Sequence, residues 1–293
     1  MTALAPRVVV VHRRTELEEL TARHGTRGQV SFFLSSRGRD LDELDDRHRA
    51  NQVAIEAVTK AVPLDWRRGT VERADLDRFL FAPDDLVVVV GQDGLVANVA
   101  KYLVGQPVIG INPEPSRNPG VLVQFAPAAA AELLRGNGTV ERRTMVEART
   151  DDGQRLLALN EIYLGHPSHQ TARYRLTAPG ATVERQASSG LIVATGTGST
   201  GWCRSAWLER HSALEPPGPT ERRLLWFVRE AWPSPATGVR STEGELAGAA
   251  LEIEVETDGL VAFGDGMESD RLTLNWGQTI QIGASERQLS LVV

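Results

Sequence analysis

The stretch LVVVVGQDG, Leu86–Gly94, decides the fold, because a run of apolar residues passes directly into a glycine-rich loop. Four of the five residues in Leu86–Val90 are β-branched. Continuous apolar runs of this kind are typical of strands that are buried on both faces of a parallel sheet. Val96–Leu103, directly after the loop, is predicted to form a helix. A buried strand, a short loop and a helix are the repeating unit of an α/β domain.

The same alternation extends in both directions from this stretch, as far as about residue 135. The further strands predicted here are Arg7–His12, Val30–Leu34 and Val108–Ile111, and the further helices are Arg14–Arg23, Leu41–Val62 and Pro127–Leu134. In the long helix, apolar residues recur at the spacing of one helix face. The N-terminal region is therefore predicted to be an α/β domain with a mostly parallel sheet.

The pattern changes at Gly136-Asn137-Gly138. Beyond this turn, strand candidates follow one another, and Ser199–Arg210 is the one clear helix candidate. The strand candidates are Thr139–Ala148, Arg155–Leu164, Ala172–Thr177, Ala181–Gln186, Leu191–Ala194, Leu224–Val228, Leu251–Glu256, Leu260–Phe263, Arg271–Leu274, Thr279–Ile282 and Leu289–Val293. We expect an α/β domain at 1–137, carrying the GQDG loop, and a β-rich domain at 138–293. Roughly the last 15 residues are expected to be able to pack back on the first domain.

Composition excludes several classes of function. A net charge of -6 over 293 residues argues against broad binding to a phosphate backbone, so no nucleic acid partner is expected. The longest aliphatic run, Leu86–Val90, is far shorter than the ~20 residues that cross a bilayer, so no membrane partner is expected either. The single Cys203 excludes an internal disulfide and a multi-cysteine zinc site, and it fits a cytoplasmic location. His166 and His169 lack a third ligand at suitable spacing, so no metal-ligating residues are predicted.

The two lysines restrict the phosphate chemistry. Neither Lys60 nor Lys101 follows a glycine, so the chain has no P-loop lysine. If the protein handles a nucleoside triphosphate, backbone amides, Mg²⁺ or arginines must neutralise the phosphate charge.

Gly91-Gln92-Asp93-Gly94 is the first candidate site, because ligands of open α/β sheets bind at the carboxyl ends of strands. Backbone amides there can approach a phosphate, aided by the positive end of the following helix. The alternative is an ordinary turn from strand to helix, with Asp93 as the helix N-cap.

Three segments of the second domain are further candidates. Gly196–Gly201 matches G-x-G-x-x-G, but it follows five β-like segments, which favours a turn offering amides and hydroxyls over a Rossmann site. Asn160-Glu161 interrupts an apolar segment; the pair suits the hydroxyls of a ribose, or else lies on a solvated edge strand. Gly264-Asp265-Gly266 is typical of a turn that needs no function.

The order of these segments is more specific than any one of them. The chain has GQDG at 91–94, VIGIN at 108–112 followed by Gly120-Val121-Leu122, NE at 160–161, SSGLIVATGTGSTGW at 188–202 and GDG at 264–266. This order resembles the NAD kinase family, and Gly190–Trp202 is the most specific part. The SSG and TGTGS variants are similar to the divergent branch that includes mitochondrial-type NAD kinases.

The resemblance implies a fold and an activity. The fold is an N-terminal α/β domain and a C-terminal β-sandwich-like domain with the ligands between them, usually in a homo-oligomer, a dimer or a tetramer. The activity is phosphorylation of the adenosine-ribose 2′-hydroxyl of NAD(H) by ATP with Mg²⁺, giving NADP(H).

The resemblance also implies roles for single residues. Asp93 is the expected general base, and Gly91, Gln92 and Gly94 lie along the ATP phosphates. Asn160 and Glu161 are expected at the ribose and adenine of NAD. The remaining residues of the expected nucleotide-binding set are Asn112, Thr195, Thr197, Gly198, Ser199, Thr200, Gly201, Trp202 and Asp265.

Three positions depart from the family pattern, and they keep other functions open. Gln92 replaces the second glycine of GGDG, where a side chain is expected to hinder a positive φ or a close approach to phosphate. Ser189 stands where many members have Asp, and Gly201-Trp202 where Ala-Tyr is common. The alternatives are a GGDG-type kinase with another acceptor, lipid or small molecule, and a catalytically silent NAD(P)-binding homologue.

Overall fold

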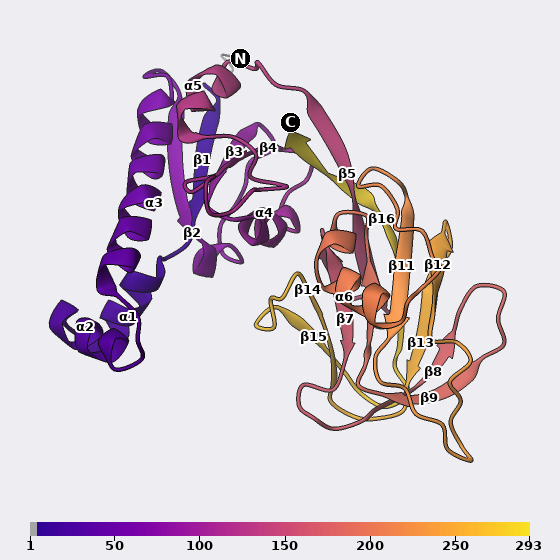
Figure 1. Ribbon diagram of the computed structural model, residues 1–293. Coiled ribbons are helices and arrows are strands. Elements are labelled where there is room, and N and C mark those ends of the chain that lie inside the picture. The colour runs from indigo at the N-terminus through magenta and orange to yellow at the C-terminus, as the bar shows by residue number, and fades with distance from the viewer. Residues whose placement is uncertain (1–4) are drawn as a thin grey trace. The chain divides into compact units, whose positions relative to one another are not determined.

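The computed structural model describes residues 5–293, which divide into two compact units. Unit 1 extends up to Glu141 and also contains Ser290–Val293, while unit 2 is Arg142–Leu289 (Figure 1). Two long strands, β5 (Val140–Thr150) and β16 (Thr279–Val292), contain residues of both units.

The sheet of unit 1 has the strand order β2-β1-β3-β4, followed by the end of β16. All of these neighbours pair in parallel, including Ser290 and Leu291 of β16 with the start of β4. The strands are β1 (Arg7–His12), β2 (Arg67–Glu72), β3 (Asp85–Val90) and β4 (Pro107–Ile111). The predicted mostly parallel sheet is confirmed.

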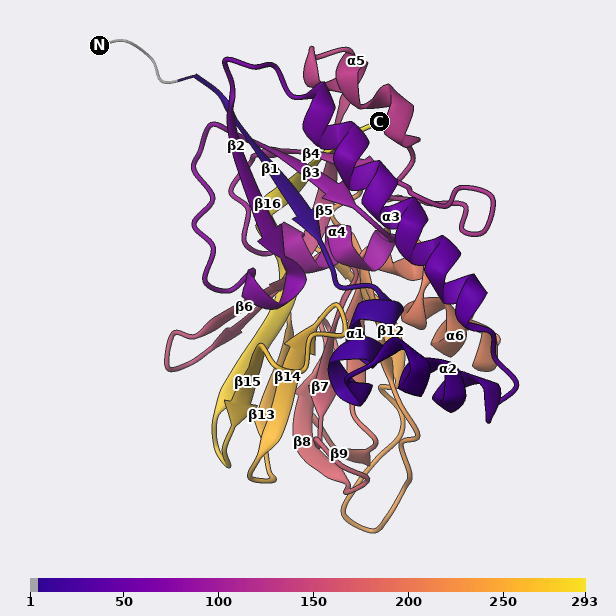
Figure 2. The ribbon, with the colours of Figure 1, turned by 90° about the vertical axis from the view of Figure 1, so that its left-hand side faces the viewer.

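The inner strands β1, β3 and β4 are buried on both faces, which agrees with their continuous runs of valine and isoleucine. On one face, Val8, Val10 and Val88 pack against α3 (Leu41–Ala61) and α5 (Ala130–Leu134). Figure 2 shows α3 lying across the strands. On α4 (Asp93–Ala100), every residue from Leu95 onward is buried. Two short 3₁₀ turns, Arg73–Asp75 and Pro127–Ala129, complete the connections.

The predicted strand Val30–Leu34 is wrong, because these residues lie in helix α2 (Arg27–Ser35), which follows α1 (Glu16–His24). The Thr26 side chain caps α2 by accepting a hydrogen bond from the amide of Gln29. Val30 and Leu34 are fully buried, whereas Phe32 is 77% exposed. That pattern is helical, since a strand would place all three side chains on one face. The buried leucines of α1 and α3 that receive them are Leu17, Leu20 and Leu44.

Strand β2 was not predicted, because its sequence RRGTVE has one apolar residue. It lies at the edge of the sheet and pairs with β1 in register from Arg67 beside Arg7. Only Val71 is buried, so hydrogen bonding to β1 rather than burial determines this strand.

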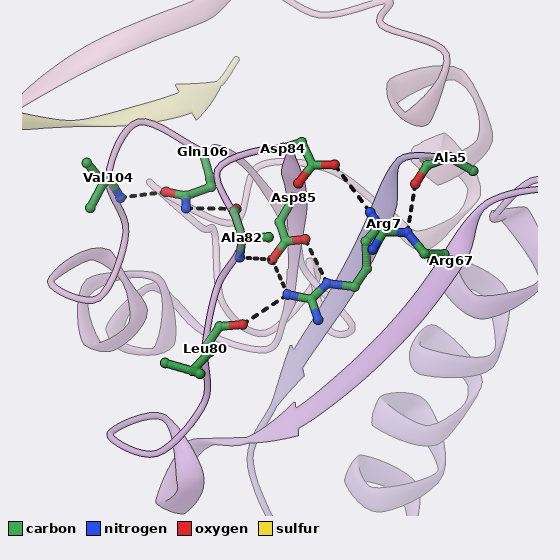
Figure 3. Close-up of polar contacts among 9 residues, drawn as sticks. All are labelled: Ala5, Arg7, Arg67, Leu80, Ala82, Asp84, Asp85, Val104 and Gln106. Carbon is green, nitrogen blue, oxygen red and sulfur yellow. Dashed lines mark hydrogen bonds and ion pairs between the residues drawn. The ribbon is translucent and has the colours of Figure 1, made fainter. Parts of the chain in front are cut away.

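A partly buried ion pair closes the amino end of the sheet (Figure 3). Arg7 of β1 donates from Nε to Oδ1 of Asp85 at 2.7 Å and from Nη2 to Oδ2 at 2.6 Å. The amide of Ala82 also donates to Oδ2 of Asp85, at 2.7 Å. Both carboxylate oxygens of Asp85 therefore have hydrogen-bond donors. Ligands of parallel sheets bind at the opposite end, where the loops follow the carboxyl ends of the strands.

Unit 2 consists of two sheets packed face to face. One contains β16-β13-β8-β9 with β5 and β6, and the other is antiparallel, in the order β12-β11-β10-β7-β14-β15. Residues of both sheets, such as Tyr174 and Leu164, form one continuous core. The other strands of unit 2 are β6 (Arg155–Ala158), β7 (Glu161–Gly165), β8 (Ala172–Thr177), β9 (Glu184–Ser188), β10 (Leu191–Ala194), β11 (Arg223–Val228), β12 (Glu243–Ala247), β13 (Leu251–Val255), β14 (Leu260–Gly264) and β15 (Arg271–Leu274). This confirms the predicted β-sandwich-like region.

The elements of unit 2 differ from their predictions in detail. The single strand predicted at Arg155–Leu164 is two strands, β6 and β7, while Thr279–Ile282 and Leu289–Val293 belong to one strand, β16. The predicted helix at Ser199–Arg210 begins as a 3₁₀ turn, Gly198–Thr200, and continues as α6 (Trp202–Glu209). Among residues 5–293, no helix has the length and apolar character that crossing a membrane requires.

The helical assignment of α2 can be tested by two substitutions. Leu34→Ala should lower the free energy of unfolding by about 2–5 kcal/mol, because it leaves a cavity beneath α2. Phe32→Ser should change it by no more than about 0.5 kcal/mol, because this ring is exposed. Urea unfolding followed by circular dichroism measures both. A large loss for Phe32→Ser would instead indicate a strand with all three residues on one buried face.

Candidate functional site

The loop Gly91–Gly94 follows β3 at its carboxyl end and leads directly into α4. Gln92 is the N-cap residue of that helix, with φ -109° and ψ 164°. These are extended backbone angles that any residue adopts, and its side chain is exposed. The hindrance expected from a positive φ at Gln92 is therefore absent. The alternative in which Asp93 is the N-cap is also wrong, since Asp93 is the first helical residue.

The Asp93 carboxylate accepts hydrogen bonds from three consecutive main-chain amides. Oδ1 accepts from Leu122 at 2.8 Å and from Val123 at 3.0 Å. The amide of Val121 lies 3.1 Å from Oδ1 and 2.9 Å from Oδ2. Oδ2 therefore has a single donor, and a carboxylate oxygen can accept two. Asp93 is fixed in position with room on Oδ2 for one further donor.

Two glycines allow the segment that carries these amides to come so close. A Cβ at Gly110, in β4, would lie 2.1 Å from the carbonyl oxygen of Leu122. A Cβ at Gly120 would lie 2.2 Å from the carbonyl oxygen of Val123. Neither position tolerates a side chain without a shift of the backbone, so the glycines of VIGIN and GVL have a steric cause.

Asn112, at the end of β4, is buried and uses its side chain to shape the loop that follows. Its Nδ2 donates to the carbonyl of Asn118 at 2.7 Å, and its Oδ1 accepts from the amide of Glu114 at 3.0 Å. The geometry thus gives Asn112 a structural task in the loop, in addition to its predicted place in the binding set.

A cavity of about 310 Å³ lies in unit 1 at this edge of the sheet. The structure brings together all five candidate residues of this unit along its wall. They are Gly91, Gln92, Asp93, Gly94 and Asn112, joined by Asn118, Pro119, Gly120 and Val123.

In unit 2, Asp265 repeats the arrangement found at Asp93. It directly follows β14 and has a positive φ of 54°. Its carboxylate accepts from the amides of Leu159 at 2.8 Å, Asn160 at 2.7 Å and Glu161 at 3.4 Å. These three residues span the break between β6 and β7. The GDG segment is therefore a turn, as predicted from the residues, and it also holds the Asn160-Glu161 pair.

The Thr195–Gly201 segment lies directly against the same break. Thr195 donates its amide to the carbonyl of Asn160 at 2.9 Å and its hydroxyl to the carbonyl of Leu159 at 2.6 Å. A Cβ at Gly198 would lie 2.2 Å from the carbonyl oxygen of Asn160. The second and third candidate segments of the sequence are therefore one structural group within unit 2.

The Rossmann alternative for this glycine segment is wrong. Strand β10, which leads into Gly196–Gly201, pairs antiparallel with both β7 and β11. A dinucleotide fingerprint belongs in a parallel βαβ unit. The hydroxyls of Ser199 and Thr200 instead donate back to the carbonyls of Gly196 and Thr197.

Glu161 is buried although β7 presents it beside a turn. Strand β7 lies between β10 and β14, so the alternative of a solvated edge strand is also wrong. Burial, together with the negative charge of Asp265, raises the pKa of Glu161 to about 8. Near neutral pH this carboxyl is largely protonated, so it can both donate and accept a hydrogen bond.

Aromatic residues adjoin this group, and the sequence reasoning missed most of them. The ring of Tyr163, two residues after Glu161 and on the same face of β7, stacks on Trp202 with centroids 5.5 Å apart. The guanidinium of Arg229 lies 5.3 Å from the Trp202 ring centroid. They line a cavity of about 200 Å³ within unit 2, together with Phe263. The period-two spacing from Glu161 is the signal that could have revealed Tyr163.

Residues 5–293 contain no cluster of three or more His, Cys, Asp or Glu residues placed to hold a metal ion. Cys203 is buried, and burial raises the pKa of its thiol to about 12, consistent with a core residue.

The close approach at Gly110 predicts a large loss of stability on substitution. Gly110→Ala should lower the free energy of unfolding of unit 1 by about 3 kcal/mol or more, because backbone rather than a flexible side chain must move. The amides of Val121–Val123 should lose their protection from hydrogen exchange. Gly94→Ala is the matched control, since a Cβ there has no neighbour within 4 Å. A small change in the free energy of unfolding for Gly110→Ala would show that the segment at Val121–Val123 can adopt another position.

The raised pKa of Glu161 predicts a pH dependence of stability. The unfolded carboxyl ionises near pH 4.5 and the folded one near 8, so the folded state binds more protons between these values. Stability of unit 2 should therefore fall as pH rises from 4.5 to 8, by on the order of a few kcal/mol. Five of the six tryptophans lie in unit 2, so their fluorescence can follow urea unfolding.

Glu161→Gln should remove most of this slope, because the amide does not titrate. Glu252→Gln, at an exposed position of the same unit, is the control and should retain it. Equal slopes in the parent and in Glu161→Gln would exclude Glu161 as the group responsible.

Comparison with known proteins gives similarity in both sequence and fold. No family model matches the chain. It is 38% identical over 133 residues to the NAD kinase of Acinetobacter baylyi, covering 41% of this chain and 42% of that protein. It is 29% identical over 141 residues to the NAD kinase of Chlorobaculum tepidum, covering 46% and 47% of the two chains. The matches thus span less than half the length of these curated relatives.

Two solved structures are similar over nearly the whole chain. An NAD kinase from Archaeoglobus fulgidus in complex with ATP has a TM-score of 0.61 at 21% identity and covers 98% of this chain and 93% of its own. Yeast NADH kinase complexed with NADH also has a TM-score of 0.61, at 15% identity, covering 100% and 84%. The expected closeness to the mitochondrial-type branch stays a prediction. The resemblance to the NAD kinase family is confirmed, and the chain has the two-domain fold of these kinases.

Proposed function

We propose that this chain is an NAD kinase, a phosphotransferase with an alcohol acceptor. It transfers the γ-phosphoryl group of ATP–Mg to the adenosine-ribose 2′-hydroxyl of NAD(H), giving NADP(H). The observation that carries the proposal is the carboxylate of Asp93, fixed by three amides on the wall of a cavity beside a glycine loop. The similarity to kinases whose structures contain ATP and NADH supports the same reaction.

Unit 1 supplies the general base and contacts to the phosphates. Phosphoryl transfer depends on positioning and on neutralising charge. Backbone amides of Gln92–Gly94 and the positive end of α4 offer both, without a P-loop lysine. Oδ2 of Asp93 has one donor and can accept the proton of the attacking hydroxyl.

Unit 2 supplies the residues that hold NAD. Asn160 and the protonated carboxyl of Glu161 match a ribose diol, because each can donate and accept hydrogen bonds. Thr195–Trp202 forms the adjoining wall, where the hydroxyl of Thr197 is buried and has no partner among residues 5–293. Such a hydroxyl suits a polar ligand.

Mg²⁺ enters as part of the ATP–Mg substrate. Mg²⁺ is commonly held by one or two carboxylates together with substrate phosphates and water.

The proposal extends to location and assembly. The resemblance supports a homo-oligomer, a dimer or a tetramer, whose partners are small nucleotides. A chain with one cysteine, the buried Cys203, fits a cytoplasmic enzyme. Of the alternatives, the silent homologue rested on Gln92. Its extended backbone removes the conformational part of that argument and favours an active kinase.

Replacing the proposed base tests the function. Asp93→Asn should lower the rate of NADP formation by about 10²–10⁴-fold, since the amide retains an acceptor for the loop but cannot take a proton. NAD binding should change little. The reaction contains NAD or NADH, ATP and Mg²⁺, and an NADP-specific dehydrogenase detects the product.

Asp46→Asn, an exposed position on α3, is the control for the lost charge and should retain full activity. If the parent consumes no ATP with either NAD or NADH although NAD binds, the protein is a silent homologue. If vesicle-borne lipid is phosphorylated in preference to NAD, the acceptor assignment is wrong.

A further inference from the structure

The loop after β4 (residues 112–125) leaves the sheet and returns to it, and its returning part carries the three amides that Asp93 accepts. It leaves at Asn112 and returns at Phe125, which forms an isolated parallel bridge with Ile111. The main-chain amide of Asn112 donates to the carbonyl of Phe125 at 2.8 Å, so the two ends of the loop lie side by side. Compact loops whose ends meet in this way are frequently functional.

Burial of apolar side chains does not fix the outward part of this loop, because none of residues 113–119 is buried. The ion pairs that reach it from α3, such as Arg117 with Glu43 at 3.2 Å, are partly exposed, and each contributes little. Asn112, in contrast, is buried. Water competes little for the hydrogen bonds of a buried amide, so Asn112 is the strongest anchor of this part of the loop.

The side chain of Asn112 closes the loop by two hydrogen bonds. Its Oδ1 accepts from the amide of Glu114 at 3.0 Å, and its Nδ2 donates to the carbonyl of Asn118 at 2.7 Å. Since one end accepts and the other donates, a short carboxamide is required to satisfy both. Aspartate would place a carboxylate oxygen against the carbonyl of Asn118, and serine could accept from Glu114 alone.

The carbonyl of Asn118 that Asn112 holds is close in sequence to the amides at Asp93. Only Pro119 and Gly120 separate Asn118 from Val121, whose amide is the first of the three. The ring of Pro119 fixes its own φ, and Gly120 packs against backbone with no room for a Cβ. The chain between the two positions has little freedom, so the position of the carbonyl determines the position of the amide.

We propose that Asn112 is a positioning residue for the general base, because it holds the loop after β4 and, through the loop, the amides that orient the carboxylate of Asp93. The inference rests on the proposed function and deepens it, since it gives Asn112 an effect on the chemical step. Asn112 also lines the cavity of about 310 Å³, so direct contact with a nucleotide is the alternative. A positioning residue affects turnover only through Asp93, whereas a contact with the nucleotide acts independently of it.

Kinetics of Asn112→Ser, alone and combined with Asp93→Asn, separate these two roles. Alone, Asn112→Ser should lower kcat for NADP formation by on the order of 10–100-fold and change the KM for ATP and for NAD by no more than about twofold. In the Asp93→Asn background it should lower the remaining rate by less than about threefold, because the base through which it acts is already absent. Asn137→Ser is the matched control and should retain full activity, since Asn137 is an exposed residue of unit 1 that hydrogen-bonds only to Glu132 on the surface.

Hydrogen exchange tests the structural step without turnover. In Asn112→Ser the amides of Val121–Val123 should exchange faster by about tenfold or more, while the amides of β1 and β3 keep their protection. Pro119→Gly loosens the same connection at an exposed position, so it tests the inference even if Asn112→Ser does not fold. It should lower kcat by about threefold or more at an unchanged KM for NAD.

Four results would overturn the inference. They are an equal loss of rate in both backgrounds, a raised KM with unchanged kcat, unchanged exchange at Val121–Val123 in Asn112→Ser, and an unchanged kcat in Pro119→Gly. The two proposals fail separately. A parent that forms no NADP removes the proposed activity alone, because the exchange measurement still decides whether Asn112 holds the segment at Asp93.

Discussion

A carboxylate just after a strand, accepting hydrogen bonds from three consecutive main-chain amides, is the interaction on which both candidate groups depend. Asp93 binds the amides of Val121–Val123 in unit 1, and Asp265 binds those of Leu159–Glu161 in unit 2. In each case the segment leaves regular sheet pairing. Without the carboxylate, its amides would have no hydrogen-bond acceptor. A charged acceptor gives stronger hydrogen bonds than a carbonyl does. One side chain thereby fixes a whole segment and directs its remaining groups.

This constraint explains why glycine occurs where it does in the motifs. Gly110 and Gly198 both lie where one backbone crosses another, with no room for a Cβ. Gly91 and Gly94 differ, because a Cβ would meet only a leucine side chain at the first and nothing at the second. The glycines around the carboxylates are thus required by packing. Gly91 is required by its φ of 156°, and Gly94 leaves space that a ligand can occupy. Gln92, with its extended backbone, belongs to the same permissive loop.

Much of the fold could be predicted from the sequence, because buried parallel strands such as Leu86–Val90 are continuous apolar runs. The local sequence pattern gave wrong predictions where residues distant in sequence determine the structure. Val30–Leu34 has strand-like composition but is helical. Thr26 caps the helix, and leucines of two other helices pack against Val30 and Leu34, which lie one turn apart. The break in Arg155–Leu164 depends on Asp265, more than 100 positions away in sequence. For the site, the order of motifs indicated which residues matter, but the amide acceptor role of Asp93 required the path of the segment after β4, which brings the amides of Val121–Val123 to its carboxylate.

In the proposed reaction, Asp93 is both the general base and the acceptor for the amides of Val121–Val123. A general base on a mobile loop would lose rate through misplacement, because catalytic contacts must be held within a fraction of an ångström. Here the amides of Val121–Val123 occupy most of the carboxylate and leave Oδ2 with a single donor. The same hydrogen bonds that hold the loop therefore select which oxygen can accept a proton. The position of the proposed base therefore depends on the loop after β4 and on the glycines that let its amides approach.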